Sequence, residues 1–249
     1  MTMEILSANR KGSWILVSNI LANVEQVRQK MAAAADRAGR NPANVTLIAV
    51  SKTRTVEEIR QVLATGVTQL GENRVQELKE KWPDIGREAT WHLIGTLQTN
   101  KVKQALDMAD LIHSLDRDSL AEELIGQAGR RGVSCKVLVQ VNVSGEESKH
   151  GIAPAELPAF LRRYGESGLL LVQGLMTMAP LDAEPEAARP HFRRLRELAA
   201  EVEQLQLPHV EMRHLSMGMS GDYEVAIEEG ATLVRVGTAL FGARPTPHL

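Results

Sequence analysis

Apolar stretches and amphipathic stretches alternate regularly along most of the chain. The first, "VTLIAVSK" (45–52), is mainly apolar and β-branched, which is typical of a buried strand. The next, "TVEEIRQVLATG" (55–66), has the apolar spacing of a helix and ends at a glycine. The pattern then repeats, and it predicts further strands at 68–73, 90–95, 110–116, 136–144, 169–178, 213–218 and 232–242.

Helical stretches separate these predicted strands. We expect helices at 74–82, 99–109, 117–132, 153–168, 187–205 and 220–230, with Pro83 ending the first of them. Alternating β and α segments imply a parallel sheet with helical crossovers. Eight such units predict a single-domain (β/α)8 TIM barrel. A doubly wound open sheet fits less well, because no G-x-G-x-x-G turn follows the first predicted strand.

The N-terminal segment lies outside this repeat. Apolar residues at helical spacing predict an additional long helix, with Ser13 as its N-cap and Gly39 as its end. Residues 1–12 are expected to form a flexible lead that is no secretory signal, and residues 13–249 a single domain.

Composition narrows the class of protein. The chain has 249 residues, 43% hydrophobic residues and a net charge of −2, so neither nucleic acid nor a membrane is an expected partner. Its one cysteine, Cys135, suits the reducing cytoplasm. No metal-ligand spacing occurs among its seven histidines, and we expect no metal.

The unusual residues fall at the predicted carboxyl ends of the strands, where barrels carry their chemistry. Lys52 ends the first predicted strand. It could extend to solvent, or it could point into the barrel mouth as a desolvated amine that reacts with carbonyl groups. Asn73 ends the second predicted strand.

The last two strands suggest an anion site. "SMGMSG" (216–221) and "GTALFG" (237–242) place small residues in the two loops that often hold a phosphate in barrels. Gly218 and Gly237 could instead serve only as tight turns. Arg235 interrupts an apolar strand and needs a partner, either an inward carboxylate such as Glu72 or a ligand. A reactive lysine, a phosphate cup and an inward cation describe a pyridoxal 5′-phosphate (PLP) site or a class I Schiff-base aldolase.

Longer motifs carry a more specific signal. "AVSKTR", "GENRVQE", "WHLIGTLQTNK", "VNVSGEESKHGI", "GLMTMAP" and "LSMGMSGDYEVAIEEGATLVRVGTALFG" together resemble the pyridoxal phosphate homeostasis proteins, over about 45–242. The resemblance implies the type III PLP fold, a barrel like the N-terminal domain of alanine racemase. It also implies a cytoplasmic protein that binds PLP and keeps its intracellular pool in balance.

The resemblance assigns roles to particular residues. It implies that Lys52 holds PLP as an internal aldimine, that Asn73 lies near the ring and that Arg235 faces the pyridine nitrogen. The phosphate would be bordered by Ser216 and Met217 and bound by Gly237 and Thr238. A ring nitrogen that faces a permanent cation stays unprotonated and is a weaker electron sink.

Two observations favour a carrier over an enzyme. A racemase of this fold uses a tyrosine as its second base, but Tyr164 and Tyr223 fall on predicted helices, away from the strand ends. Only "ARPTPHL" follows Gly242, so we expect no β-rich second domain like that of a racemase. We therefore expect no catalytic residue, a monomer, and PLP-dependent apo-enzymes as candidate recipients. An amino-acid racemase or other PLP-dependent enzyme remains the alternative. His92 is expected to be a hydrogen-bonded core residue rather than a ligand contact.

Overall fold

The computed structural model describes residues 6–8, 14–16, 20–146, 150–180 and 184–243. Eight parallel strands close into a barrel in the order β10-β3-β4-β5-β6-β7-β8-β9. The strands are β3 (Thr46–Val50), β4 (Gln69–Glu72), β5 (Thr90–Leu93), β6 (Leu111–Leu115), β7 (Cys135–Gln140), β8 (Leu170–Met176), β9 (Val210–Ser216) and β10 (Leu233–Val236). The predicted (β/α)8 barrel is confirmed.

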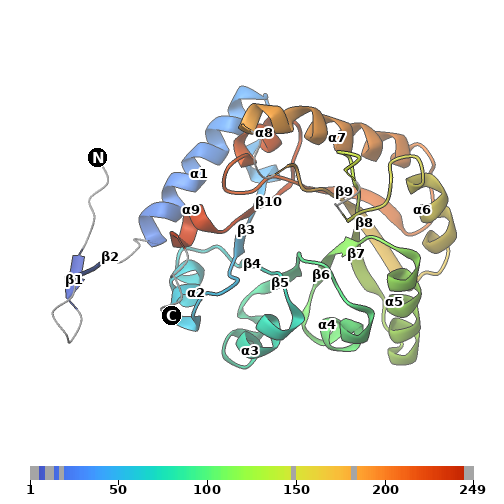
Figure 1. Cartoon of the computed structure of the whole chain (residues 1–249), viewed down its shortest axis with the longest axis horizontal. Helices are drawn as coiled ribbons and strands as arrows, with labels where there is room; N and C mark the ends of the chain where they lie inside the picture. The colour runs from blue at the N-terminus through green and yellow to red at the C-terminus, as the bar shows by residue number, and fades with distance from the viewer. Residues whose placement is uncertain (1–5, 9–13, 17–19, 147–149, 181–183, 244–249) are drawn as a thin grey trace.

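Helices surround the barrel as an outer ring (Figure 1). They are α1 (Ile20–Arg37), α2 (Val56–Ala64), α3 (Val75–Ile85), α4 (Val102–Met108), α5 (Asp118–Arg131), α6 (Leu157–Gly165), α7 (Arg189–Glu203), α8 (Tyr223–Glu228) and α9 (Thr238–Phe241). Short 3₁₀ turns occur at Pro42–Asn44, Gly86–Glu88, Thr99–Lys101 and Pro185–Ala188. None of the described helices is long and apolar enough to cross a membrane.

The extra N-terminal helix is present, but it begins later than predicted. Its buried stripe is Ile20, Val24, Val27, Met31 and Ala34, and this spacing starts at Ile20. Trp14–Leu16, which we expected inside the helix, instead forms β2 and pairs antiparallel with β1 (Leu6–Ala8). An aromatic and branched apolar run favours a strand. The predicted N-cap Ser13 and most of the predicted lead lie outside the described residues.

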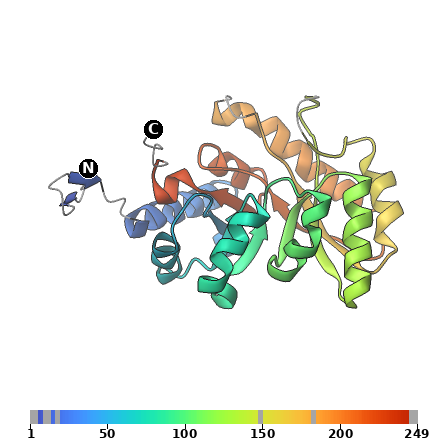
Figure 2. The same cartoon turned by 60° about the horizontal axis from the view of Figure 1, so that its bottom comes forward.

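Helix α1 lies beside α9 in both views (Figures 1 and 2). The two are joined by a hydrogen bond from Asn23 Nδ2 to the Leu240 carbonyl oxygen, at 2.8 Å. Because α9 has only four residues, it covers little of the barrel wall by itself. The longer α1 covers that wall, packing against α2, α8 and α9.

The predicted end of the second crossover helix is wrong. Helix α3 continues through Pro83 to Ile85. A proline in the last turn removes one main-chain hydrogen bond, which a helix end tolerates better than a helix interior does. The range 232–242, which we predicted as a strand, contains β10 and then the short helix α9. The other helices and strands of the barrel lie within a few residues of the predicted ranges. Because the eight strands are parallel, their carboxyl ends all lie at one rim.

Candidate functional site

A cavity of about 930 Å³ opens at the carboxyl rim of the barrel. Residues from most of the strand ends line it: Val50, Lys52, Arg54, Asn73, Ile94, Gly95, Thr96, Gln140, His150, Met178, Ala179, Pro180, Glu184, Pro185, Met219, Ser220, Gly221, Asp222, Arg235, Gly237 and Thr238. The lining combines charged groups, Lys52, Arg54 and Arg235 among them, with apolar residues and with small residues of the last two loops. Such a mixture of apolar walls and a few polar groups is typical of a small-molecule site.

Lys52 follows the buried strand end Val50–Ser51 and lines the cavity, half-exposed. Thr53, the next residue, has a φ of 62°. The left-handed region is rare for a β-branched residue and often marks a functional position. Glu77 holds this turn, because its Oε2 accepts the Thr53 N–H at 2.9 Å. The strand end therefore presents the lysine to the cavity through a constrained turn.

A buried polar cluster lies beneath Lys52; we name it the Glu72 cluster, for Glu72, Lys81 and Ser51. Oε1 of Glu72 accepts from Lys81 Nζ and from Ser51 Oγ, each at 2.6 Å, and Lys81 also donates to the Ser51 carbonyl. Within the described residues Glu72 Oε2 is buried without a hydrogen-bond partner. Burial raises the pKa of Glu72, although Lys81 and Ser51 act in the opposite direction.

Arg235 lines the cavity from β10 and is buried. Its Nη1 donates to Ser216 Oγ at 2.5 Å, and its Nη2 donates to the Thr177 carbonyl oxygen at 2.9 Å. Burial lowers the pKa of Arg235 to about 10, and Asp222 opposes this shift. Glu72, the carboxylate that we considered as a structural partner of this arginine, is bound instead to Lys81. Arg235 is thus a buried cation with two neutral acceptors, next to the cavity.

The loop after β9 meets the start of α9. Ser220 Oγ accepts the N–H groups of Gly237 and Ala239, at 3.3 Å each. Gly218 has a φ of 92°, and a methyl group on it would lie 2.6 Å from Ala226 Cβ, so this glycine is required by the turn. Gly237 has a φ of −119°, which other residues adopt readily. Gly237 therefore lines the cavity without serving a tight turn.

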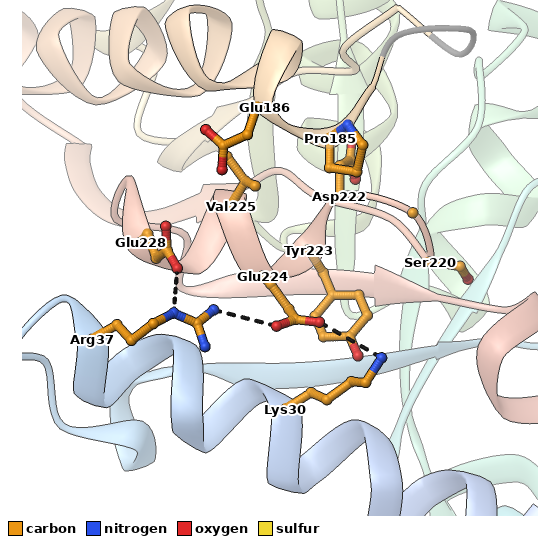
Figure 3. A pocket seen from close by; sticks show the side chains of 11 residues that line it. Lys30, Arg37, Pro185, Glu186, Ser220, Asp222, Tyr223, Glu224, Val225 and Glu228 are labelled. Atoms are coloured by element: carbon orange, nitrogen blue, oxygen red, sulfur yellow. Dashed lines mark hydrogen bonds and ion pairs between the residues drawn. The ribbon is translucent and has the colours of Figure 1, made fainter.

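A smaller hollow of about 310 Å³ lies on the other side of this loop (Figure 3). It shares Pro185, Ser220, Gly221 and Asp222 with the large cavity. In it Arg37 pairs with Glu228 at 2.7 Å and with Glu224 at 3.3 Å. These ion pairs join α1 to α8, the helix that follows the loop, and so they support the loop from behind.

The seven predicted cofactor-binding residues divide into two groups. Lys52, Asn73, Arg235, Gly237 and Thr238 all line the large cavity. Ser216 and Met217 are fully buried and are not among its lining residues. Their role beside a phosphate stays a prediction.

Sequence reasoning missed several lining residues. Gln140 is a polar residue at the end of a buried strand, and this was a usable signal. Ser220 lies in the loop 216–221 that we had singled out, and Asp222 directly follows it, but the pattern alone did not show which of these side chains line the cavity. No tyrosine is among the lining residues of the large cavity. Tyr164 donates to Asp118 in the outer helices, and Tyr223 lies on the smaller hollow.

Comparisons with known proteins agree with this architecture. The family model described as "Alanine racemase, N-terminal domain" matches residues 17–245. Alanine racemase from Corynebacterium glutamicum shares the fold, with a TM-score of 0.66 at 17% identity, covering 90% of this chain and 63% of that one. The fold and its rim cavity thus define a barrel of the alanine racemase N-terminal type.

Nearer relatives narrow this class. The pyridoxal phosphate homeostasis protein of Aquifex aeolicus is 44% identical over 227 residues, which is 91% of this chain and 99% of that protein. PipY of Synechococcus elongatus, solved with PLP bound, has a TM-score of 0.78 at 38% identity and covers 90% of this chain and 100% of its own. The chain belongs to the family of the pyridoxal phosphate homeostasis proteins.

Proposed function

We propose that this protein binds PLP in the large rim cavity through Lys52 and takes part in balancing the intracellular PLP pool. The observation that carries the proposal is the convergence of Lys52, Asn73, Arg235, Gly237 and Thr238 on one cavity. Several separate strand ends supply these residues. The PLP-bound structure of PipY, at 38% identity over its whole length, supports the choice of ligand.

Each group has a part suited to its chemistry. The amine of Lys52 would bind the PLP aldehyde covalently. The N–H groups of Gly237 and Ala239 would receive the phosphate where they now reach Ser220 Oγ, with the Thr238 hydroxyl beside them. Arg235 would face the ring nitrogen as a hydrogen-bond donor. A ring nitrogen beside this cation stays unprotonated, which disfavours carbanion chemistry.

We propose a binding role without catalysis. No tyrosine is among the lining residues of the cavity, whereas a two-base racemase needs a second base opposite the lysine. The names of the relatives at 37–44% identity, all pyridoxal phosphate homeostasis proteins, support the same choice. We further propose a monomer in the cytoplasm, with PLP-dependent apo-enzymes as recipients of the cofactor.

The test of binding is an absorbance spectrum of the purified protein with PLP, before and after borohydride reduction. We expect a yellow protein whose reduced label maps to the peptide that contains Lys52. Lys52→Ala should lose the label, and Lys79→Ala, on the exposed face of α3, should keep it. A label on another lysine would refute the site, and a protein that stays colourless with PLP would favour the aldolase alternative.

The test of catalysis uses the PLP-loaded protein with single L-amino acids. We expect no D-isomer and no keto acid beyond the yield of one turnover. Sustained production of either would establish the racemase or another PLP-dependent enzyme in place of the carrier. Recovery of activity by an apo-enzyme, mixed with the loaded protein and a trap for dissociated PLP, would test the delivery step.

A further inference from the structure

A line of hydrogen-bonded side chains runs through the barrel interior, from Arg235 at the cavity wall to Gln69 at the start of β4. It runs from Arg235 to Ser216 (2.5 Å), to His113 (2.8 Å), to His92 (2.9 Å) and to Gln69 (2.8 Å). Five different strands supply these five residues, which we name the Arg235 relay. Ser216, His113 and His92 are all buried, at 0%, 0% and 4% exposure, so water does not substitute for their bonds.

The relay has one direction in which every group is satisfied. A guanidinium only donates, so Ser216 Oγ accepts from Arg235. If His113 also donated to Ser216, the buried Ser216 hydroxyl proton would need an acceptor that neither bond supplies. The hydroxyl therefore donates to His113 Nδ1. His113 Nε2–H then donates to His92 Nδ1, and His92 Nε2–H donates to the oxygen of Gln69.

This direction requires both imidazoles to be neutral, with the proton on Nε2. Burial agrees with that requirement. It lowers the pKa of His92 to about 3, and it lowers the pKa of His113 well below the usual value. The two rings meet edge to face, with their centroids 5.1 Å apart. A neutral chain of donors and acceptors therefore supports the arginine without neutralising its charge.

Other titratable groups face the relay from neighbouring elements. His214, on β9 like Ser216, lowers the pKa of both His92 and His113 as a like charge, and so does Arg235 for His113. Arg213 in turn lowers the pKa of His214, after burial. Asp222, from the loop after β9, raises the pKa of Arg235 against the larger effect of burial. Most of these charges favour neutral imidazoles in the relay.

We propose that Ser216, His113 and His92 are positioning residues, which fix the guanidinium of Arg235 as a directed, charged donor at the cavity wall. Ser216 would then act on the ring end of the ligand through Arg235, and not at the phosphate. The inference deepens the proposed function and rests on it where the ligand is concerned. The arrangement of protons in the relay can be tested without any ligand.

The first experiment uses the cofactor-free protein with ¹⁵N-labelled histidine rings. Long-range ¹H–¹⁵N spectra distinguish the two neutral tautomers and the charged ring. We expect His92 and His113 to be neutral with the proton on Nε2 at pH 7 and to remain so at pH 5. In the variant His92→Gln the ring signals of His92 disappear, which distinguishes them from the ring signals of His113. A charged ring or an Nδ1–H tautomer for either residue at pH 7 would overturn the relay.

The second experiment follows the absorbance of bound PLP against pH in Ser216→Ala, Ser216→Thr and His113→Gln. Losing the hydroxyl removes one of the two acceptors of the guanidinium of Arg235 and leaves only the Thr177 carbonyl to hold it. A guanidinium that moves away from the ring nitrogen lets that nitrogen take a proton more readily. The pH midpoint of the absorbance change reports protonation of the ring nitrogen of bound PLP. We expect Ser216→Ala to raise this midpoint by about one pH unit and to weaken PLP binding about tenfold. Ser216→Thr, which keeps the hydroxyl, should restore most of both values.

The control is His191→Gln, on the outer helix α7, which should leave the midpoint and the affinity unchanged. Circular dichroism and Tm show whether each variant is folded. If folded Ser216→Ala and His113→Gln keep the wild-type midpoint while the wild type binds PLP, the positioning role is wrong and the proposed function stands. If the wild type binds no PLP, the proposed function fails, and the NMR result alone decides the relay.

Discussion

Two buried polar clusters differ in how they accommodate charge: the Glu72 cluster, which adjoins Lys52 through Ser51, and the Arg235 relay, whose arginine lines the cavity. In the Glu72 cluster a buried carboxylate and a buried ammonium neutralise each other at 2.6 Å. In the Arg235 relay a buried guanidinium bonds only to a hydroxyl and a carbonyl, and a chain of neutral imidazoles stands behind it. The first arrangement leaves no net charge on the pair, and we expect it to have a structural role. The second keeps a positive charge available at the cavity wall, which suits a ligand acceptor atom.

The difference shows that burial alone does not identify a site. Both Glu72 and Arg235 are buried, and burial shifts both pKa values toward the neutral form. What separates them is the hydrogen-bonding partner, which is charged for Glu72 and neutral for Arg235, on which Asp222 acts only as a nearby charge. A charge with an internal counter-ion has a structural role, whereas a buried cation with neutral partners next to a cavity indicates recognition of a ligand.

The largest expected effect comes from breaking the paired cluster. Lys81→Met leaves the buried carboxylate of Glu72 without its counter-ion, and it should lower the free energy of unfolding by about 3–5 kcal/mol. Urea denaturation of the cofactor-free protein measures this. The double variant Glu72→Leu/Lys81→Met should recover most of the loss. A single variant within about 1 kcal/mol of the wild type would show that the pair does not stabilise the fold.

The neutral relay should make the fold sensitive to acid. Burial lowers the pKa of His92 to about 3, below the unfolded value, so the unfolded chain binds the extra proton first as pH falls. Stability should therefore fall between about pH 6 and pH 4, by about 1.4 kcal/mol per pH unit for each such histidine. His92→Gln removes one of the protons that the unfolded chain takes up, so it should reduce this slope by about 1.4 kcal/mol per pH unit. An unchanged slope in urea denaturation series would contradict a neutral buried His92.

Removing the guanidinium of Arg235 should affect the fold less than Lys81→Met does. Arg235→Leu breaks two hydrogen bonds to neutral acceptors and removes a buried charge, so we expect a loss of only about 1–2 kcal/mol in unfolding free energy. PLP affinity should fall at least about tenfold. Arg235→Lys keeps the charge but loses the planar fork, and it should bind PLP with intermediate affinity. A stability loss as large as that of Lys81→Met would erase the distinction between the two clusters.

The smallest effect on the fold is expected at the last loop. Gly237→Ala adds a methyl group 3.4 Å from Val50 at an ordinary φ, so the unfolding free energy should change by less than about 0.5 kcal/mol. PLP affinity should still fall, because the methyl group enters the cavity. Gly218→Ala is the contrasting variant, since its methyl group would lie 2.6 Å from Ala226. Equal thermal stability of the two variants would contradict this assignment of the glycines.

Much of the barrel could be predicted from local pattern, because each strand and helix carries its own periodicity. The errors lie where local preference and context compete. Trp14–Leu16 continues an apolar run into α1 but pairs with Leu6–Ala8, and such pairing depends on a segment outside the run. Pro83 is a helix breaker by propensity, yet its place in the last turn of α3 makes it tolerable.

The sequence by itself determined the order of the elements, the rim at which the cavity opens and five of the residues that line it, which are Lys52, Asn73, Arg235, Gly237 and Thr238. A residue at a strand end is directed to the rim by the parallel barrel, whatever its neighbours. Tertiary structure alone decided the partners of buried charges: Glu72 with Lys81, and Arg235 with Ser216. Glu72 and Lys81 lie nine residues apart on β4 and α3, and Ser216 and Arg235 lie 19 residues apart on β9 and β10. Only the packing of these elements in the closed barrel sets the distances between their side chains.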